Sequence, residues 1–290
     1  MKMQRDLITI VTGSPAQVPE SAAKQLGIKV LPFNIQMKGR FYLDNVDITP
    51  SEVYQAMRNS NVLPTTAAPS IGEYHQIFQS LLKNGIGKII YVAVANKLSG
   101  DYAIAESVAK EIKSGNKECE ISIFDSSIGA VPQGFLAMGA AEKAKRGDPI
   151  GDILQWLEQA KNRVGFVMSL DSLDYLARGG RIGKASHFLG SILHIHPLLS
   201  LNDGVVVPVS IQRNSNKILP AMVNVLKERV KNHKILRLAI FHADASERAI
   251  ALKELVREEL YQDEILICEF TPVMGVHTGP GTIGIGYYFE

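Results

Sequence analysis

Strand signals alternate with helix signals along the first half of this chain, and this order constrains its fold more than any other feature. Short apolar, β-branched segments predict buried strands at 7–12, 28–33, 88–94 and 120–124. Capped or amphipathic segments predict helices between and after them, at 19–25, 50–58, 71–83, 100–113 and 135–145. Strands that alternate with helices pair in parallel, and ligand loops lie at the carboxyl ends of such strands. The sequence therefore predicts an α/β protein.

The boundary between two domains is expected after a predicted helix at 150–163, which carries the only tryptophan. A strand follows this helix at once, and no linker-like composition marks the junction. We therefore expect an N-terminal α/β domain with a parallel sheet at 1–163 and a C-terminal α/β domain at 164–290.

The predicted second domain mixes helices with strands. The tripeptide Asn202-Asp203-Gly204 predicts a hairpin between two strands. A helix is expected at 186–193. The last segment is rich in glycine, and we expect it to form a loop that leads into a final strand at 283–289.

Composition excludes several classes of protein. The formal net charge is +2, and lysines and arginines are scattered, so nothing indicates nucleic acid binding. No apolar run approaches the ~20 residues of a membrane span, and the polar N-terminus does not resemble a signal peptide. The two cysteines are Cys119, at the start of the strand predicted at 120–124, and Cys268, in a strand predicted at 265–271, where buried hydrophobic residues are expected. We therefore expect a reduced, cytoplasmic protein without a membrane span.

A heptapeptide at 64–70, with the sequence Pro-Thr-Thr-Ala-Ala-Pro-Ser, is the most informative local feature. Ser70 and Glu73 form the pattern of a capping box, which predicts the start of a helix. The two prolines disfavour helix just before them, so Thr65 and Thr66 are held extended beside a positive helix end. This arrangement suits a small anion such as a carboxylate, although an ordinary capped loop has the same pattern.

Other loops combine a hydroxyl or a cation with glycine or proline at the end of an element. They are Thr12-Gly13-Ser14, Ser99-Gly100-Asp101-Tyr102, the segment from Arg178 to Gly183 with Arg181 inside it, and the segment from Val276 to Gly281 with His277 inside it. Each alone is more often a turn than a site. Together they describe a crevice with a few polar groups in an apolar protein, which is typical of a small-molecule pocket.

The usual catalytic and cofactor signatures are missing from the chain. It has no G-x-x-x-x-G-K-[ST], no G-x-G-x-x-G after the first strand, no H-E-x-x-H and no G-x-S-x-G. His194 and His196 lie two residues apart, but packing explains them better than a metal site. Asp125 ends a predicted strand, where capping the next loop is the simplest role. We expect no cofactor and no metal.

These loops resemble, in order, the motifs of the DegV family. The heptapeptide is similar to P-x-T-S-Q-P-S, Ser99-Gly100-x-Tyr102 to S-G-T-Y, and Asp125-Ser126 to D-[ST] at the end of a strand. The later segments are similar to L-x-[KR]-G-G-R-I at 176–182, to K-P-I-L followed by D-G at 196–204, and to H-x-G-P-G at 277–281. The resemblance covers essentially the whole chain.

The resemblance implies two α/β domains with a long-chain fatty acid buried between them and no catalysis by the protein itself. It implies that a separate fatty acid kinase receives the ligand and makes acyl phosphate for phospholipid synthesis. The residues that it nominates for the ligand are Thr66, Ser99 and His277 as carboxylate contacts, Gly100 through its N–H, Thr65 beside them, and Arg178 and Arg181 at the pocket mouth or a partner surface.

The chain departs from the family pattern at several positions. Ala67 and Ala68 replace a serine and a glutamine, and Asp101 replaces a threonine. An inward-pointing Asp101 would repel a carboxylate. Two alternatives therefore stay open: a divergent member that binds another small lipid or metabolite, and a hydrolase or acyl transferase that uses Ser99 or Ser14 with His277.

Overall fold

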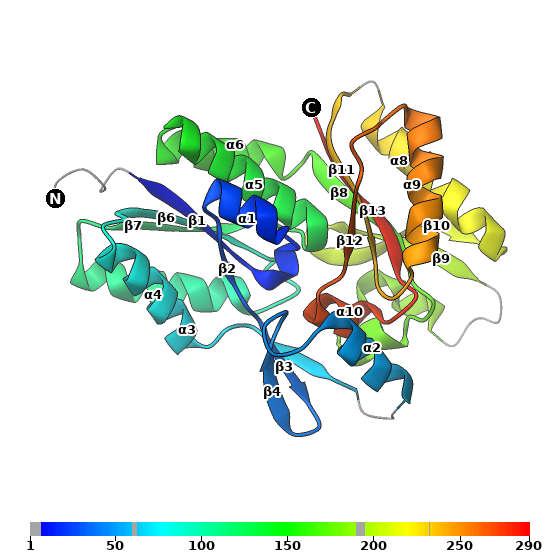
Figure 1. Ribbon diagram of the computed structural model, residues 1–290, viewed down its shortest axis with the longest axis horizontal. Helices are drawn as coiled ribbons and strands as arrows, with labels where there is room; N and C mark the ends of the chain where they lie inside the picture. The colour runs from blue at the N-terminus through cyan, green and yellow to red at the C-terminus, as the bar shows by residue number, and fades with distance from the viewer. Residues whose placement is uncertain (1–6, 60–62, 190–194, 232) are drawn as a thin grey trace. The chain divides into compact units, whose positions relative to one another are not determined.

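The computed structural model describes residues 7–59, 63–189, 195–231 and 233–290 (Figure 1). Its contacts divide the chain into two compact units. Unit 1 consists of Met1–Asn34 and Ala67–Asn162, and unit 2 consists of Ile35–Thr66 and Arg163–Glu290. Each unit is α/β, which confirms the predicted fold class.

Unit 1 is built on a four-stranded parallel sheet with the strand order β2-β1-β6-β7. Its strands are β1 (Ile8–Gly13), β2 (Lys29–Leu31), β6 (Lys88–Ala93) and β7 (Glu120–Asp125). Its helices are α1 (Glu20–Leu26), α3 (Ile71–Lys83), α4 (Asp101–Gly115), α5 (Ala130–Arg146) and α6 (Ile150–Ala160). Figure 1 shows α3 and α4 on one face of the sheet and α1, α5 and α6 on the other. This is the predicted parallel sheet covered on both faces.

Helix α3 shows how local sequence and packing agree in this unit. The Ser70 side chain accepts a bond from the Glu73 N–H (3.3 Å), and the Glu73 carboxylate accepts one from the Ser70 N–H (2.7 Å), so the predicted capping box is present. Tyr74, Phe78 and Leu81 recur on one side of the helix and are buried against the sheet. Burial of each such side chain contributes roughly 1.5–3 kcal/mol.

Unit 2 contains a six-stranded mixed sheet with the strand order β10-β9-β8-β13-β11-β12. Its strands are β8 (Val164–Ser169), β9 (His196–Asn202), β10 (Val205–Gln212), β11 (Ile235–His242), β12 (Leu266–Glu269) and β13 (Ile283–Phe289). Only the β11–β12 pair is parallel. Helices α8 (Ile218–Val230) and α9 (Ser246–Leu260) pack on this sheet through Met222, Leu226 and Leu252. Shorter helices are α7 (Asp174–Arg178), α10 (Pro272–Thr278) and a 3₁₀ helix at Gly183–Phe188.

Residues 35–66 belong to unit 2, although the sequence placed them in the first domain. They form β3 (Asn34–Met37), β4 (Arg40–Leu43), α2 (Pro50–Asn59) and the start of β5 (Thr65–Ala67), and the three strands make a small sheet with the order β4-β3-β5. Long-range bonds explain the grouping: the Tyr54 hydroxyl donates to the Phe270 carbonyl (3.1 Å), and the Asp44 carboxylate accepts from the Val273 N–H (2.9 Å). The predicted boundary after residue 163 lies within one residue of the junction at 162/163, but a single boundary wrongly places residues 35–66 in the first domain.

Three further expectations differ from the structure. The glycine-rich loop before β13 contains helix α10, which starts at Pro272 and includes Gly275. The helix expected at 186–193 is replaced by the 3₁₀ helix at Gly183–Phe188, while residues 190–193 lie outside the described part. Helix α5 begins at Ala130, earlier than expected. Among the described residues, no helix is long and apolar enough to cross a bilayer.

Candidate functional site

Thr66 and His277 meet in unit 2, although 211 residues separate them. The Thr66 hydroxyl oxygen lies 2.7 Å from His277 Nε2, within hydrogen-bond distance. Thr66 is the middle residue of β5 and is partly buried. His277 lies in the last turn of α10, not in the loop that the sequence predicted. Thr65 is exposed, because successive side chains of a strand point to opposite faces. The structure thus pairs Thr66, and not Thr65, with the histidine.

His277 is a neutral side chain near pH 7. Loss of solvation lowers the pKa of its imidazole to about 4, and the positive charge of Arg181 contributes to the shift. Its Nδ1 is buried and has no hydrogen-bond partner among the residues that the structure describes. Gly179 packs against this edge of the ring, since a Cβ on Gly179 would lie only 2.7 Å from Nδ1. Gly179 therefore forms one wall of the histidine site.

The neutral imidazole leaves a hydroxyl hydrogen for a ligand. When the ring proton is on Nε2, it donates to the Thr66 oxygen, and the Thr66 O–H can then donate to a third group. The other tautomer would bury an Nδ1–H with no acceptor among the described residues. The pair is thus suited to donate a hydrogen bond to an anion while carrying no charge itself.

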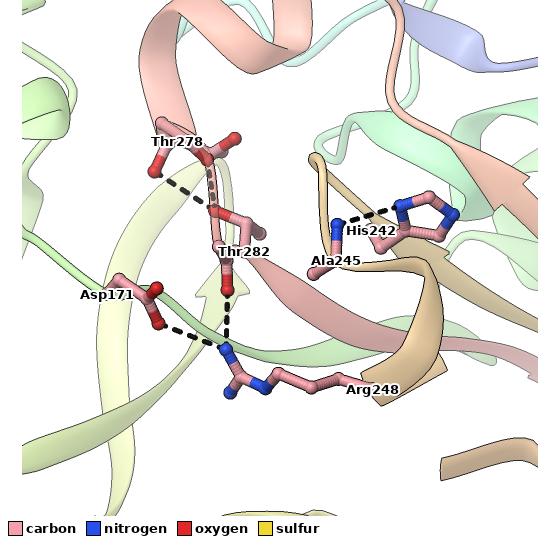
Figure 2. Close-up of polar contacts among 8 residues, drawn as sticks. Asp171, His242, Ala245, Arg248, Thr278 and Thr282 are labelled. Carbon is pink, nitrogen blue, oxygen red and sulfur yellow. Dashed lines mark hydrogen bonds and ion pairs between the residues drawn. The ribbon is translucent and has the colours of Figure 1, made fainter. Parts of the chain in front are cut away.

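A network of hydrogen bonds and one ion pair fixes the turn that follows α10 (Figure 2). The Thr282 hydroxyl lies 3.0 Å from the Thr278 carbonyl and 2.9 Å from the Gly279 carbonyl, to which it donates. Arg248 donates to the Gly281 carbonyl (2.9 Å) and forms an ion pair with Asp171 (3.0 Å). These contacts hold the C-terminal end of the helix that carries His277. Sequence analysis missed Asp171, Arg248 and Thr282, because their partners are distant in sequence or are backbone carbonyls.

Gly279 and Gly281 are required by this turn. Their φ angles are +77° and +86°, in the region that L side chains rarely adopt. A Cβ at Gly279 would lie 2.1 Å from the Tyr175 ring, and a Cβ at Gly281 would lie 1.9 Å from the Asp171 carboxylate. The Gly-Pro-Gly sequence therefore serves close packing at this point of unit 2.

Ser99 and Gly100 lie in unit 1, at the start of the 15-residue helix α4. The Ser99 hydroxyl oxygen accepts a bond from the Asp101 N–H (3.2 Å), and this bond does not use its hydrogen. Gly100 is the N-cap residue and has no side chain of its own to cap the helix. The first N–H groups of a helix lack intrahelical partners and carry partial positive charge. This turn is a second set of hydrogen-bond donors.

Asp101 does not point toward the donors of its own turn. It is fully buried, with 0% of its surface exposed, and its carboxylate accepts bonds from the hydroxyls of Tyr74 and Tyr91. Burial raises the pKa of this carboxyl to about 6, although the tyrosine bonds oppose the shift. The Asp101 carboxylate points into the core of unit 1 and away from the Ser99–Gly100 turn. It therefore repels an anion at that turn less than a carboxylate that pointed toward the anion would.

The remaining nominated residues have varied surroundings. Arg178 is exposed, whereas Arg181 is partly buried and donates to the Gly179 carbonyl. Ser14 is buried, and its hydroxyl accepts from the Phe33 N–H (3.0 Å). The Asp125 carboxylate accepts from the N–H groups of Asn96 (3.2 Å) and Ser127 (2.9 Å), which is the capping role expected for it.

The described residues offer no standard metal site or catalytic triad. No group of three or more His, Cys, Asp or Glu side chains in this part of the chain could hold a metal ion. His196 begins strand β9, and His194 lies outside the described residues. A nucleophile–histidine pair usually has a third group that orients the base, but within the described chain His277 Nδ1 has no such partner.

A profile of the family described as "Uncharacterised protein, DegV family" matches residues 7–290. The chain belongs to the DegV family. DegV of Bacillus subtilis is 30% identical to it over 287 residues, which cover 98% of this chain and 99% of that protein. A DegV domain-containing protein of Clostridium perfringens is 33% identical over 279 residues, covering 95% of each chain. The motif resemblance found in the sequence is therefore confirmed at the level of the family.

Solved DegV structures share the whole fold of this family member. A DegV-family protein of Thermus thermophilus, described by its fatty acid binding, has a TM-score of 0.90 and 28% identity, covering 98% of this chain and 99% of that one. DegV of Bacillus subtilis, described as a fatty acid binding protein, has a TM-score of 0.86 and 29% identity with the same coverage. Both alignments include the two units of this chain.

Proposed function

We propose that this protein binds a long-chain fatty acid and holds its carboxylate with the Thr66–His277 pair. The observation that carries the proposal is the 2.7 Å contact between the Thr66 hydroxyl and His277 Nε2, beside an imidazole that is neutral near pH 7. Two solved relatives at 28% and 29% identity are described as binding fatty acids, which supports the same class of ligand here.

The carboxylate needs several donors, because an unpaired buried charge is very costly. Thr66 supplies one O–H, and the charge of Arg181, which lowers the pKa of His277, also favours a nearby anion. We propose that the Ser99 hydroxyl and the Gly100 N–H of unit 1 are also donors to a ligand carboxylate. Each charge-assisted bond contributes about 1.5–3 kcal/mol.

The acyl chain is proposed to supply most of the affinity. Each buried methylene contributes about 0.8 kcal/mol, so two methylenes match the lower value for one charge-assisted bond. The tail therefore determines how tightly a ligand binds, while the head-group donors determine that the ligand is an acid. Arg178 and Arg181 are proposed to lie at the mouth of the pocket or on a partner surface.

We propose a binding protein without catalysis of its own, which presents the acid to a fatty acid kinase. The motif resemblance supports the kinase step, and the missing orienting partner at His277 Nδ1 among the described residues supports the absence of a hydrolase. A fatty acid kinase supplied with ATP should form acyl phosphate only when this protein delivers the acid. A fluorophosphonate probe should leave Ser99 and Ser14 unlabelled, and labelling of either would favour a hydrolase or acyl transferase.

Native mass spectrometry tests the ligand class. The purified protein should carry one fatty acid of about C14–C18, or take up one equivalent of added oleate. Denaturing extraction identifies whatever is bound. Recovery of an empty protein that also refuses oleate and palmitate would contradict the proposal. Recovery of a different small lipid or metabolite would favour a divergent member of the family.

A further inference from the structure

Asp101 is an unusual first residue for a helix. Acidic side chains are favoured in the first turn because the positive helix end stabilises their negative charge, and they usually do so from the surface. The side chain of Asp101 instead turns into the core of unit 1 and is fully buried. A buried carboxylate is stable only when donors surround it, so its contacts indicate what holds it.

Three donors from two elements and the loop after β6 surround the Asp101 carboxylate. The Tyr91 hydroxyl in β6 donates to Oδ1 (2.6 Å), and the Tyr74 hydroxyl in α3 donates to the same oxygen. The Val94 N–H, just after β6, donates to Oδ2 (3.0 Å). The Tyr74 and Tyr91 rings meet edge to face, with their centroids 5.6 Å apart, which fixes the two hydroxyls.

Asp101 also forms bonds to both ends of the segment at 94–99, which leads into the Ser99–Gly100 turn. At one end, its carboxylate is bonded to the Val94 N–H. At the other end, its own N–H donates to the Ser99 hydroxyl oxygen (3.2 Å). The orientation of the Ser99 hydroxyl therefore depends on where the Asp101 backbone lies. The buried carboxylate in turn anchors that backbone.

We propose that Asp101 is a positioning residue, whose buried carboxylate holds the Ser99 hydroxyl and the Gly100 N–H in place to receive the carboxylate of the ligand. The inference rests on the proposed function. Asp101 acts through Ser99 and Gly100 and does not touch the ligand itself. A purely structural Asp101 would stabilise unit 1 and affect all ligands equally, whereas a positioning residue affects the recognition of an acid in particular.

The test compares two ligands that differ only in the head group. Oleate carries the carboxylate, and oleyl alcohol has the same tail without the charge. We measure the dissociation constants of both for the wild type and for Asp101→Asn. The matched control is Asp152→Asn, which changes an exposed acid in the first turn of α6 in the same unit.

Asp101→Asn should weaken oleate binding about tenfold or more, the effect of one lost charge-assisted bond, and should change oleyl alcohol binding less than about twofold. Asp152→Asn should leave both constants unchanged. Tyr91→Phe removes one donor and leaves the carboxylate in place. It should also raise the ratio of the oleate dissociation constant to the oleyl alcohol dissociation constant. The Tyr91→Phe variant therefore tests the positioning role of Asp101 even if the Asp101→Asn protein does not fold.

Equal weakening of both ligands, or no weakening of either, would overturn the positioning role. These outcomes are distinct from failure of the proposed function, in which the wild type itself would not bind oleate.

Discussion

At the scale of single residues, a neutral histidine is the central feature of the candidate site. Burial and the charge of Arg181 keep the pKa of His277 at about 4, so the ring carries no charge near pH 7. With its proton on Nε2, the ring donates to the Thr66 oxygen, and the Thr66 hydroxyl is the group that we propose to contact the ligand. Two substitutions separate these contributions.

Thr66→Val removes the hydroxyl and keeps the shape of the side chain. We expect the dissociation constant for oleate to rise about 10- to 100-fold, because a hydrogen bond to a charged group is worth about 1.5–3 kcal/mol. Thr65→Val is the same change one residue earlier, on the opposite face of β5, and should leave the constant unchanged. Isothermal titration with oleate measures both. Equal effects of the two variants would contradict the assignment of Thr66.

Gly179→Ala places a methyl group against the buried edge of His277. The new Cβ would lie 2.7 Å from Nδ1 and 3.2 Å from the Tyr175 carbonyl, so the ring must leave its present position beside Thr66. We expect weaker oleate binding, because the displaced ring no longer holds the Thr66 hydroxyl at its present 2.7 Å contact. Gly151→Ala, at an open position in α6, should bind normally and raise stability by up to about 1 kcal/mol. Normal binding by Gly179→Ala would show that the ring position is not critical.

At the scale of elements, helix α10 and its following turn hold His277 in place. Thr282 is fully buried, and its hydroxyl is shared by two carbonyl oxygens at the end of this helix (Figure 2). The ion pair between Arg248 and Asp171 is partly exposed, so we expect it to contribute little by comparison. The buried threonine is therefore the stronger stabiliser of this element.

Thr282→Val should leave both carbonyls without this donor. We expect the free energy of unfolding to fall by about 1–3 kcal/mol, the cost of unsatisfied buried polar groups. Amide hydrogen exchange should speed up most in residues 272–282. Urea denaturation and exchange mass spectrometry measure the two effects. A change in exchange spread evenly over unit 2 would contradict a local role for Thr282.

Local patterns predicted many of the elements well. Helix α3 at Ile71–Lys83 and strand β13 at Ile283–Phe289 have the bounds that the sequence predicted for them. Helix α10 was missed because it has only seven residues, starts at a proline and contains Gly275, so it has no amphipathic period to detect. Short local signals cannot reveal such a helix, which is held by tertiary contacts.

The candidate site was only partly predictable for the same physical reason. Thr66 and His277 were named from motifs, but their contact joins residues 211 positions apart, which no local pattern encodes. The assignment of residues 35–66 to unit 2 depends on the bonds of Tyr54 and Asp44 to the segment around α10. The burial of Asp101 depends on two tyrosines from other elements. Each of these features is set by tertiary packing.

At the scale of the whole molecule, the two units carry buried groups with opposite responses to pH. Burial raises the pKa of Asp101 in unit 1 from 3.8 to about 6, so its stabilisation is complete below 3.8 and is lost as pH rises through 6. Burial lowers the pKa of His277 in unit 2 from 6.5 to about 4, so its stabilisation is complete above 6.5 and is lost as pH falls through 4.

Acidification from pH 7 to about pH 4.5 should therefore shift the units in opposite directions. Relative to Asp101→Asn, the wild type should gain protection in unit 1, and relative to His277→Gln it should lose protection in unit 2, each by about 1–3 kcal/mol. Hydrogen exchange at both pH values, corrected for intrinsic rates, measures each unit separately. Parallel shifts in the two units would contradict the signs of the two pKa changes.

The most direct test of the central claim observes the carboxylate itself. Palmitate labelled with ¹³C at C1 should give a separate bound carboxyl resonance when added to the wild-type protein. We predict that this resonance moves or disappears in Thr66→Val and stays unchanged in Thr65→Val. If no bound resonance forms, or if the same resonance appears in both variants, the Thr66–His277 pair does not hold the carboxylate.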